Sequence, residues 1–96
     1  MIVHIVFFKF KDENKSENIQ KVAEALHGLV QKIDGLLSME VGIDFNKSER
    51  AFDLSLYSTF NSKEDLQAYA IHPAHSEVVS LIKEVTTQTK VVDYEK

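Results

Sequence analysis

The sequence predicts an α+β domain of the ferredoxin-like class. In this class the order strand, helix, strand, strand, helix, strand (β-α-β-β-α-β) forms a split βαβ unit with a four-stranded antiparallel sheet. Two observations predict it. Short segments rich in β-branched and aromatic residues alternate with two regions of helical hydrophobic spacing, and the two middle strands are joined by a linker short enough for a hairpin. Right-handed crossovers then place the first and third strands at the centre of the sheet, with the helices on one face. We expect a single domain over residues 1–96.

The first two elements are a strand over residues 2–10 and a long helix. The strand is short, β-branched and aromatic. We expect the helix to begin near Ser16, a suitable N-cap residue, and to end at Asp34 and Gly35, where a glycine can adopt the left-handed conformation that closes a helix. Its apolar residues have helical spacing: Ile19, Val22, Ala23, Leu26, Leu29, Val30 and Ile33.

A hairpin is expected to follow. Residues 37–44 alternate between apolar and polar side chains, as in a half-buried strand, and residues 46–50 form the turn. The third strand covers residues 52–60. Apolar side chains of the second strand are expected on one face: Leu37, Met39, Val41 and Ile43. The third strand is expected to carry Phe52, Leu54 and Leu56 on one face, with Asp53, Ser55 and Tyr57 on the other.

The second helical region is expected to be broken in two. Ser62 opens it with a pattern that resembles a capping box. His72 ends the first piece, because the residue before a proline avoids the helical region. Pro73 suits the first position of a new helix, which ends before Thr86. The last strand then covers residues 89–94.

Composition excludes several classes of function. Lysine and arginine number 11 against 15 acidic residues, a net charge of −4, so the basic stripe that a nucleic-acid partner requires is absent. Without cysteine there can be no disulfide, thiolate zinc site or thiol nucleophile, and we expect a cytoplasmic location. The longest apolar run, residues 5–8, is far too short to cross a bilayer, so we expect no membrane partner.

The first strand predicts a homodimer. Val3, Ile5 and Phe7 point to one side of the strand and the mostly apolar set that contains His4 and Phe8 points to the other. The helices can cover only one face, and the chain has no further element to cover the second. A second copy, packed sheet to sheet, is the simplest cover.

The segment from Tyr69 to His75 concentrates reactive side chains at the helix break. His75 would lie in the first turn of the last helix, where the helix dipole disfavours a positive charge, so a neutral imidazole could act as a general base. The Tyr69 hydroxyl could hold a substrate carbonyl or a developing enolate. The structural interpretation is that His72 caps a helix, Tyr69 packs in the core and His75 bonds to a backbone carbonyl. We expect no metal, because no third ligand lies near the two histidines.

Residues 2–11, residues 52–60 and the element His72-Pro73-Ala74-His75 resemble the stress-responsive α/β-barrel (Dabb) family, over essentially the whole chain. The His-Pro-x-His element is the most specific part of the resemblance. The resemblance implies a ferredoxin-like protomer that dimerises through its sheets into an α/β barrel. A plant cyclase of this family closes a linear polyketide by an aldol reaction, with a tyrosine and a histidine that Tyr69 and His75 match.

The resemblance also implies a pocket. His4 matches a pocket histidine of the cyclase, and we expect it on the same face as Asp53 and Tyr57, where two packed sheets would enclose an apolar space with a few polar groups. The alternative is a purely structural role, in which His4 is a core histidine and Phe8 and Tyr57 only pack against neighbouring side chains. The chain departs from the cyclase at Leu26 and Asp53, where the cyclase has a tyrosine and a histidine.

Three functions remain open. The first is a homodimer that binds a small, partly apolar molecule between sheet and helices, with Tyr69 and His75 as catalytic residues and His4, Phe8, Asp53, Tyr57 and His72 as binding residues. The second is a non-catalytic stress or assembly module. The third is a monooxygenase-like barrel that needs no metal or flavin. None of them requires a cofactor.

Overall fold

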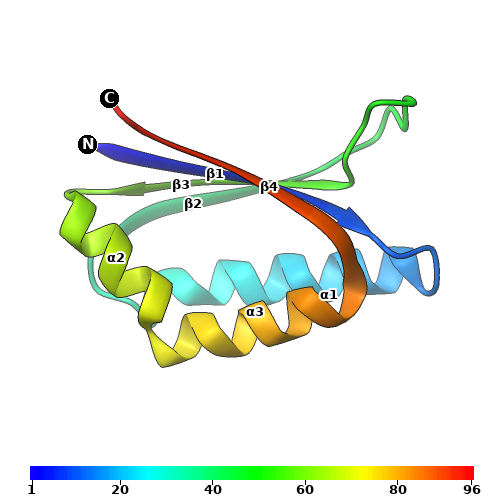
Figure 1. The fold of residues 1–96 in the computed structure, drawn as a ribbon. Coiled ribbons are helices and arrows are strands. Elements are labelled where there is room, and N and C mark those ends of the chain that lie inside the picture. The colour runs from blue at the N-terminus through cyan, green and yellow to red at the C-terminus, as the bar shows by residue number, and fades with distance from the viewer.

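The computed structural model describes residues 1–96 and has the predicted ferredoxin-like α+β architecture. One four-stranded antiparallel sheet, of strand order β2-β3-β1-β4, carries all the helices on one face (Figure 1). The chain passes through β1 (Ile2–Phe10), α1 (Lys15–His27), the 3-10 helix η1 (Gly28–Gln31), β2 (Leu36–Ile43), β3 (Leu54–Phe60), α2 (Lys63–Ile71), α3 (Pro73–Val85) and β4 (Thr86–Glu95).

The prediction that the first and third strands occupy the centre of the sheet is confirmed. β1 pairs with β3 on one side and with β4 on the other. The two chain ends therefore meet at one end of the sheet (Figure 1), where the amide of Lys96 donates to the carbonyl of Met1 at 2.8 Å. The first and last segments of the chain thus lie side by side along their whole length.

The hydrophobic core fills the space between the sheet and the helices. β1 contributes its even-numbered residues, because alternate side chains of a strand point to opposite faces. Tyr69 near the end of α2 closes this core at one end and is 1% exposed. Among the core residues are Phe8, Phe10, Val22, Leu26, Leu54 and Phe60.

One prediction about the faces of the sheet is wrong. His4 pairs with Ser58 of β3, whereas Tyr57 pairs with Ile5. His4 therefore points toward the helices, and Tyr57 points to the opposite face. The prediction failed because the polar alternation of β3 does not tell which face the helices cover; they cover the face of Leu54 and Leu56, which are buried.

The boundaries of the first helix also differ from the prediction. Its N-cap position is Asn14, which adopts a left-handed conformation with φ 52° and makes no side-chain capping bond, so Ser16 lies inside the first turn. The regular α-helix ends at His27, and η1 continues it in tighter form. Gly35 has the expected positive φ, 89°, but it lies in the turn before β2 rather than directly after a helix.

The strands depart from the prediction at three places. A bulge between Leu36 and Ser38 turns Leu36 into the core and leaves Leu37 exposed, which shifts the alternation at the start of β2. β3 begins at Leu54, two residues later than expected. β4 begins at Thr86 directly after α3, so the linker expected before residue 89 is part of the strand.

The break in the second helical region is confirmed. α2 ends at Ile71, and His72 adopts an extended conformation, with φ −67° and ψ 137°. The Nδ1 atom of His72 accepts a hydrogen bond from the amide of Ala74 at 3.0 Å, and Pro73 occupies the first position of α3. This cap lets α3 change direction and pack beside α1 (Figure 1).

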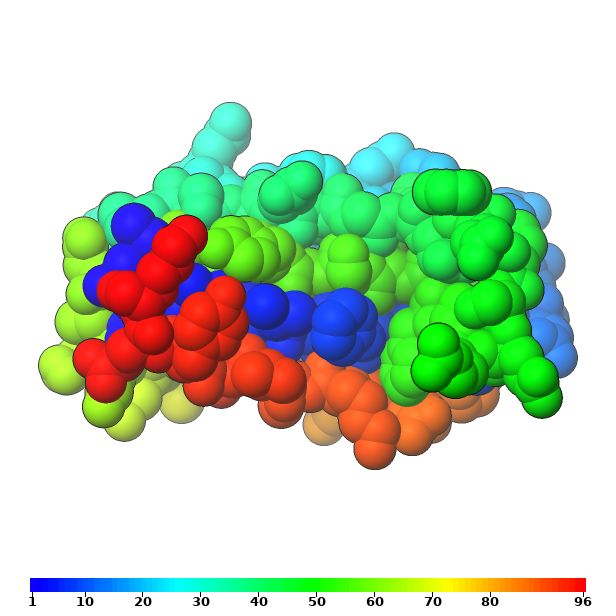
Figure 2. Space-filling model, turned by 90° about the horizontal axis from the view of Figure 1, so that it is seen from above, coloured from blue at the N-terminus to red at the C-terminus, as the bar shows by residue number.

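The face of the sheet opposite the helices is open. Figure 2 views this face, with the blue β1 between the green β3 and the red β4. Phe7 of β1, and Val92 and Tyr94 of β4, are exposed apolar side chains there, and Phe7 packs edge-on against Phe52. No helix is both long enough and apolar enough to span a membrane.

Candidate functional site

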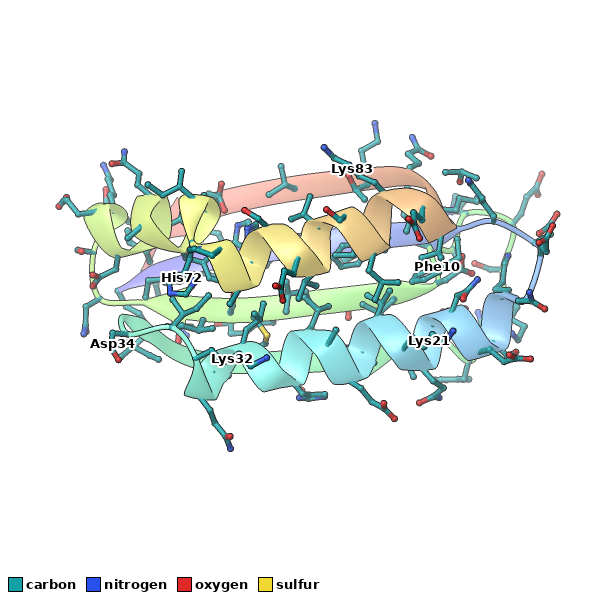
Figure 3. The ribbon with its side chains drawn as sticks, turned by 90° about the horizontal axis from the view of Figure 1, so that it is seen from below. Phe10, Lys21, Lys32, Asp34, His72 and Lys83 are labelled. Atoms are coloured by element: carbon teal, nitrogen blue, oxygen red, sulfur yellow. The ribbon has the colours of Figure 1, made fainter.

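A cavity of about 360 Å³ lies between the sheet and the helices. β1 and β3 form its floor, α1 closes one side, and α3 forms the other wall beside β4. Figure 3 views the molecule from the helix side and shows α3 lying between α1 and β4. The middle of the cavity is apolar, and its walls there are Val6, Phe8, Leu26, Leu56, Val79 and Ile82.

Tyr69 lines this cavity and carries a hydroxyl that has no hydrogen-bond partner. It is held near the end of α2, and its ring packs against Phe60 with the ring centroids 5.1 Å apart. Its hydroxyl is buried and has no hydrogen-bond partner. Burial raises the pKa of Tyr69 to about 12, so the phenol keeps its proton near neutral pH. A buried hydroxyl that has lost water and gained no partner is ready to donate to a ligand oxygen.

His75 lies beside Tyr69, in the first turn of α3. The two ring centroids are 4.3 Å apart. Nδ1 of His75 lies 3.2 Å from the carbonyl oxygen of Ala70, and because a carbonyl only accepts, Nδ1 carries the proton of a neutral ring. Nε2 then keeps a free lone pair. Burial lowers the pKa of His75, so the imidazole stays neutral at pH 7 and Nε2 can accept a proton.

The structural interpretation of this segment describes real contacts. His72 caps α3, Tyr69 packs in the core and His75 bonds to a backbone carbonyl. These contacts do not involve the two reactive atoms, because the Tyr69 hydroxyl and Nε2 of His75 form no hydrogen bond. The segment therefore keeps a free donor on Tyr69 and a free acceptor on His75, in rings whose centroids are 4.3 Å apart.

His4 lines the same cavity from β1, and its ring lies 6.1 Å from that of Tyr69. Its Nδ1 contacts the carboxylate of Asp93 on β4. Sequence reasoning missed Asp93. The signal was available, because a ferredoxin-like sheet pairs the first and last strands in antiparallel fashion, and His4 and Asp93 are register partners.

The structure therefore brings together four of the seven residues predicted from the sequence and separates three. His4, Phe8, Tyr69 and His75 line the cavity. The carboxylate of Asp53 lies at the far end of the sheet, where it accepts from the amide of Phe10 at 2.7 Å. Tyr57 lies on the open face of the sheet, and His72 is the cap of α3.

The two departures from the cyclase also separate in space. Leu26 lines the cavity, but Asp53 does not, and the residue of β3 that reaches the cavity is Leu56. The polar residues that line the cavity carry imidazoles, a phenol, an ammonium, an amide and hydroxyls. No group of three histidine or acidic side chains is arranged to hold a metal ion. A neutral imidazole and a phenol are side chains that can accept and donate a proton.

Three comparisons relate the chain to known proteins. The family model of the stress responsive A/B barrel domain (Dabb) matches residues 2–96. A stress-response A/B barrel domain-containing protein of Arabidopsis thaliana is 39% identical over 82% of the chain, and olivetolic acid cyclase of Cannabis sativa is 26% identical over 97% of the chain and 94% of the cyclase. The crystal structure of a dimeric protein of unknown function from Bacteroides fragilis superimposes with a TM-score of 0.91 and 32% identity, over 99% of this chain and 95% of that one.

The matched relatives differ in length. The chain spans 30% of the length of the Arabidopsis relative that is 39% identical to it, whereas it covers nearly all of olivetolic acid cyclase. The domain thus occurs both as part of a longer protein and as almost the whole of a small one.

Proposed function

The chain belongs to the family of stress-responsive A/B barrel domains, and on this premise we propose that it is a homodimer that binds a small, partly apolar molecule in the cavity between the sheet and the helices. The observation that carries the proposal is that Tyr69, whose buried hydroxyl has no hydrogen-bond partner, lines a largely apolar cavity together with His75. A few convergent polar groups in an apolar cavity are typical of small-molecule sites.

The open face of the sheet supports the homodimer. Its exposed apolar side chains, among them Phe7 and Val92, have no covering element within the chain. The similar structure from Bacteroides fragilis is described as dimeric. Sheet-to-sheet packing would remove these side chains from water and would leave the cavity, which lies on the other face, accessible.

We extend the proposal to acid-base chemistry. Nε2 of His75 removes a proton from a carbon next to a carbonyl group, and the Tyr69 hydroxyl donates a hydrogen bond to the carbonyl oxygen as negative charge develops there. The resulting enolate can attack a second carbonyl carbon, so that a carbon–carbon bond forms as the C=O π bond opens, and the His75 imidazolium returns its proton to the alkoxide oxygen; the reverse sequence breaks a carbon–carbon bond. Olivetolic acid cyclase, which covers almost the same length, is by its name an enzyme that closes a ring.

A second candidate is a non-catalytic assembly module. The bond from His75 to the carbonyl of Ala70 and the cap formed by His72 favour it, because both histidines then have structural partners. On this alternative the homodimer itself is the functional unit, and the cavity binds nothing with selectivity.

A ligand screen with matched variants tests the proposal. Thermal-shift measurements on a library of small carbonyl compounds identify binders, and the best binder is then tested for turnover. We expect His75→Ala and Tyr69→Phe to lose turnover while they keep the fold, and the controls His27→Ala and Tyr94→Phe to keep both. Full turnover in the first two variants would refute the catalytic proposal. Binding unaffected by all four would refute the cavity as the site.

A further inference from the structure

The cavity is elongated, because its two longest walls run in the same direction. On α3, His75, Val79 and Lys83 face the cavity at successive turns, and eight residues of α-helix span about 12 Å. On β1, alternate residues from His4 to Phe8 line the floor over about 13 Å. The wall and the floor therefore have the same length.

The two walls are also aligned end to end. At the first end, where α3 begins, the ring of Tyr69 lies 6.1 Å from that of His4 and 4.3 Å from that of His75. At the second end, where β1 and α3 both terminate, the amide of Lys11 donates to the carbonyl of Val85 at 2.9 Å. Lys11 directly follows β1, and Val85 is the last residue of α3. A ligand that lies along the cavity thus has one end at the imidazoles and the other at the junction of α3 with β4.

The two ends differ in chemistry. The first end holds a phenol and two imidazoles. The second end is lined by Lys83, which is exposed, and by a cluster of polar side chains from the start of β4, among them Thr89, the register partner of Phe8. The space between these ends is apolar.

Charge distinguishes the second end further. Lys83 forms no ion pair, whereas Lys15 and Lys63 are each paired with acidic residues. None of the residues that line the cavity is acidic, although the chain as a whole carries a net charge of −4. Figure 3 shows Lys83 on α3 beside β4. A cation at one end of a cavity without acidic residues favours an anionic ligand.

We infer that the cavity takes an elongated molecule with an apolar middle, a carbonyl group at the Tyr69 and His75 end and a carboxylate at Lys83. This inference rests on the proposed function and names the class of its ligand. One lysine balances one negative charge, so a monoanionic carboxylate fits better than a phosphate with two charges. Lys83 is therefore a specificity-determining residue that lies about 12 Å from the reacting groups.

Binding of three probes by titration calorimetry tests the inference. The probes are 9-oxodecanoate, which carries a ketone and a carboxylate at opposite ends, its neutral methyl ester, and decyl phosphate. In the wild-type protein at low ionic strength we expect 9-oxodecanoate to bind about fivefold more tightly than the ester, the size expected for an exposed ion pair, and more tightly than decyl phosphate. Added salt should reduce this preference, because it screens an exposed charge.

Variants assign the preference to Lys83. Lys83→Gln should bind the acid and the ester equally, and Lys83→Arg should keep the preference. Lys21→Gln is the matched control, because Lys21 is exposed on α1 (Figure 3) and does not line the cavity; it should behave as the wild type. Equal binding of acid and ester by the wild type, tighter binding of decyl phosphate, or a preference that survives in Lys83→Gln would overturn the inference alone. If neither ketone probe binds, the proposed ligand site fails with it.

Discussion

Asp93 holds His4 in place from the opposite end of the chain. The carboxylate of Asp93 contacts Nδ1 of His4, across the pair of strands that begin and end the domain. Since a carboxylate only accepts, Nδ1 carries the proton, and the ring presents its other nitrogen away from Asp93. The last strand therefore fixes the orientation of a side chain that lines the cavity.

The first prediction concerns this pair. Asp93→Ala should lower the free energy of unfolding by about 0.5–1 kcal/mol at pH 7, since the lost bond involves a charged group that is half-exposed. Urea unfolding measures the loss. The control is Asp12→Ala, whose fully exposed carboxylate pairs only with Lys15 one turn away and should leave stability unchanged. Equal effects of the two substitutions would contradict a structural pairing of Asp93 with His4.

The second prediction concerns the cost of the Tyr69 hydroxyl. A buried polar group without a partner is unfavourable, so Tyr69→Phe should raise the free energy of unfolding of the ligand-free protein, by about 1 kcal/mol. The same substitution should weaken any ligand that accepts a bond from the phenol. Tyr94→Phe, on the open face of the sheet, should change neither. A destabilised Tyr69→Phe would mean that the hydroxyl has a partner in solution and is not free to bind.

The third prediction concerns pH. Burial lowers the pKa of His75 in the folded protein below its ordinary value of 6.5. The unfolded chain then binds this proton more readily, so the contribution of His75 makes the protein less stable as the pH falls through 6.5 toward the folded pKa. Thermal unfolding at pH 7 and at pH 5 should show a smaller acid loss in His75→Gln than in the wild type. His27→Gln, at an exposed position, should retain the full acid loss.

The fourth prediction contrasts two glycines. Gly35 has a φ of 89°, and a Cβ there would lie 2.9 Å from Cγ of Asp65, so Gly35→Ala should destabilise the protein by about 1–3 kcal/mol. Gly28 is helical and has open space around it, so Gly28→Ala should stabilise by about 0.5–1 kcal/mol. Chemical unfolding of both variants measures the difference. The same sign for both would contradict the backbone assignment.

Hydrophobic periodicity was sufficient to predict the order of the elements, and the backbone geometry of proline predicted the helix break at Pro73. These features depend on local signals, because spacing and the geometry of proline act within a few residues. The boundaries depended on less local effects. Asn14 replaced Ser16 at the first helix because it tolerates a left-handed conformation, and the bulge after Leu36 reset the alternation of β2.

The candidate site was predictable only in part, for a related reason. Tyr69 and His75 are close in sequence, so the helix break brings them together. The partner of His4 depends instead on the pairing of β1 with β4, and the face on which His4 lies depends on which side of the sheet the helices cover. Alternation gives two faces but does not name the buried one. Asp93 was missed because it meets His4 only through the pairing of β1 with β4. Tyr57 was wrongly expected beside His4 because the buried face of the sheet was not known.

The last prediction tests the homodimer. Val92 lies on the open face of the sheet and is 54% exposed in the single chain, so Val92→Glu should leave the fold of the protomer intact. In a symmetric sheet-to-sheet dimer the substitution places two carboxylates in an apolar interface. The cost of burying unpaired charges should weaken the dimer on the order of a hundredfold or more. Sedimentation velocity at micromolar concentration should then show a monomer.

The matched control is Ile71→Glu at the end of α2, which is 81% exposed and lies off the sheet. If Ile71→Glu dissociates the dimer and Val92→Glu does not, the copies meet through the helices, and the open face needs another partner.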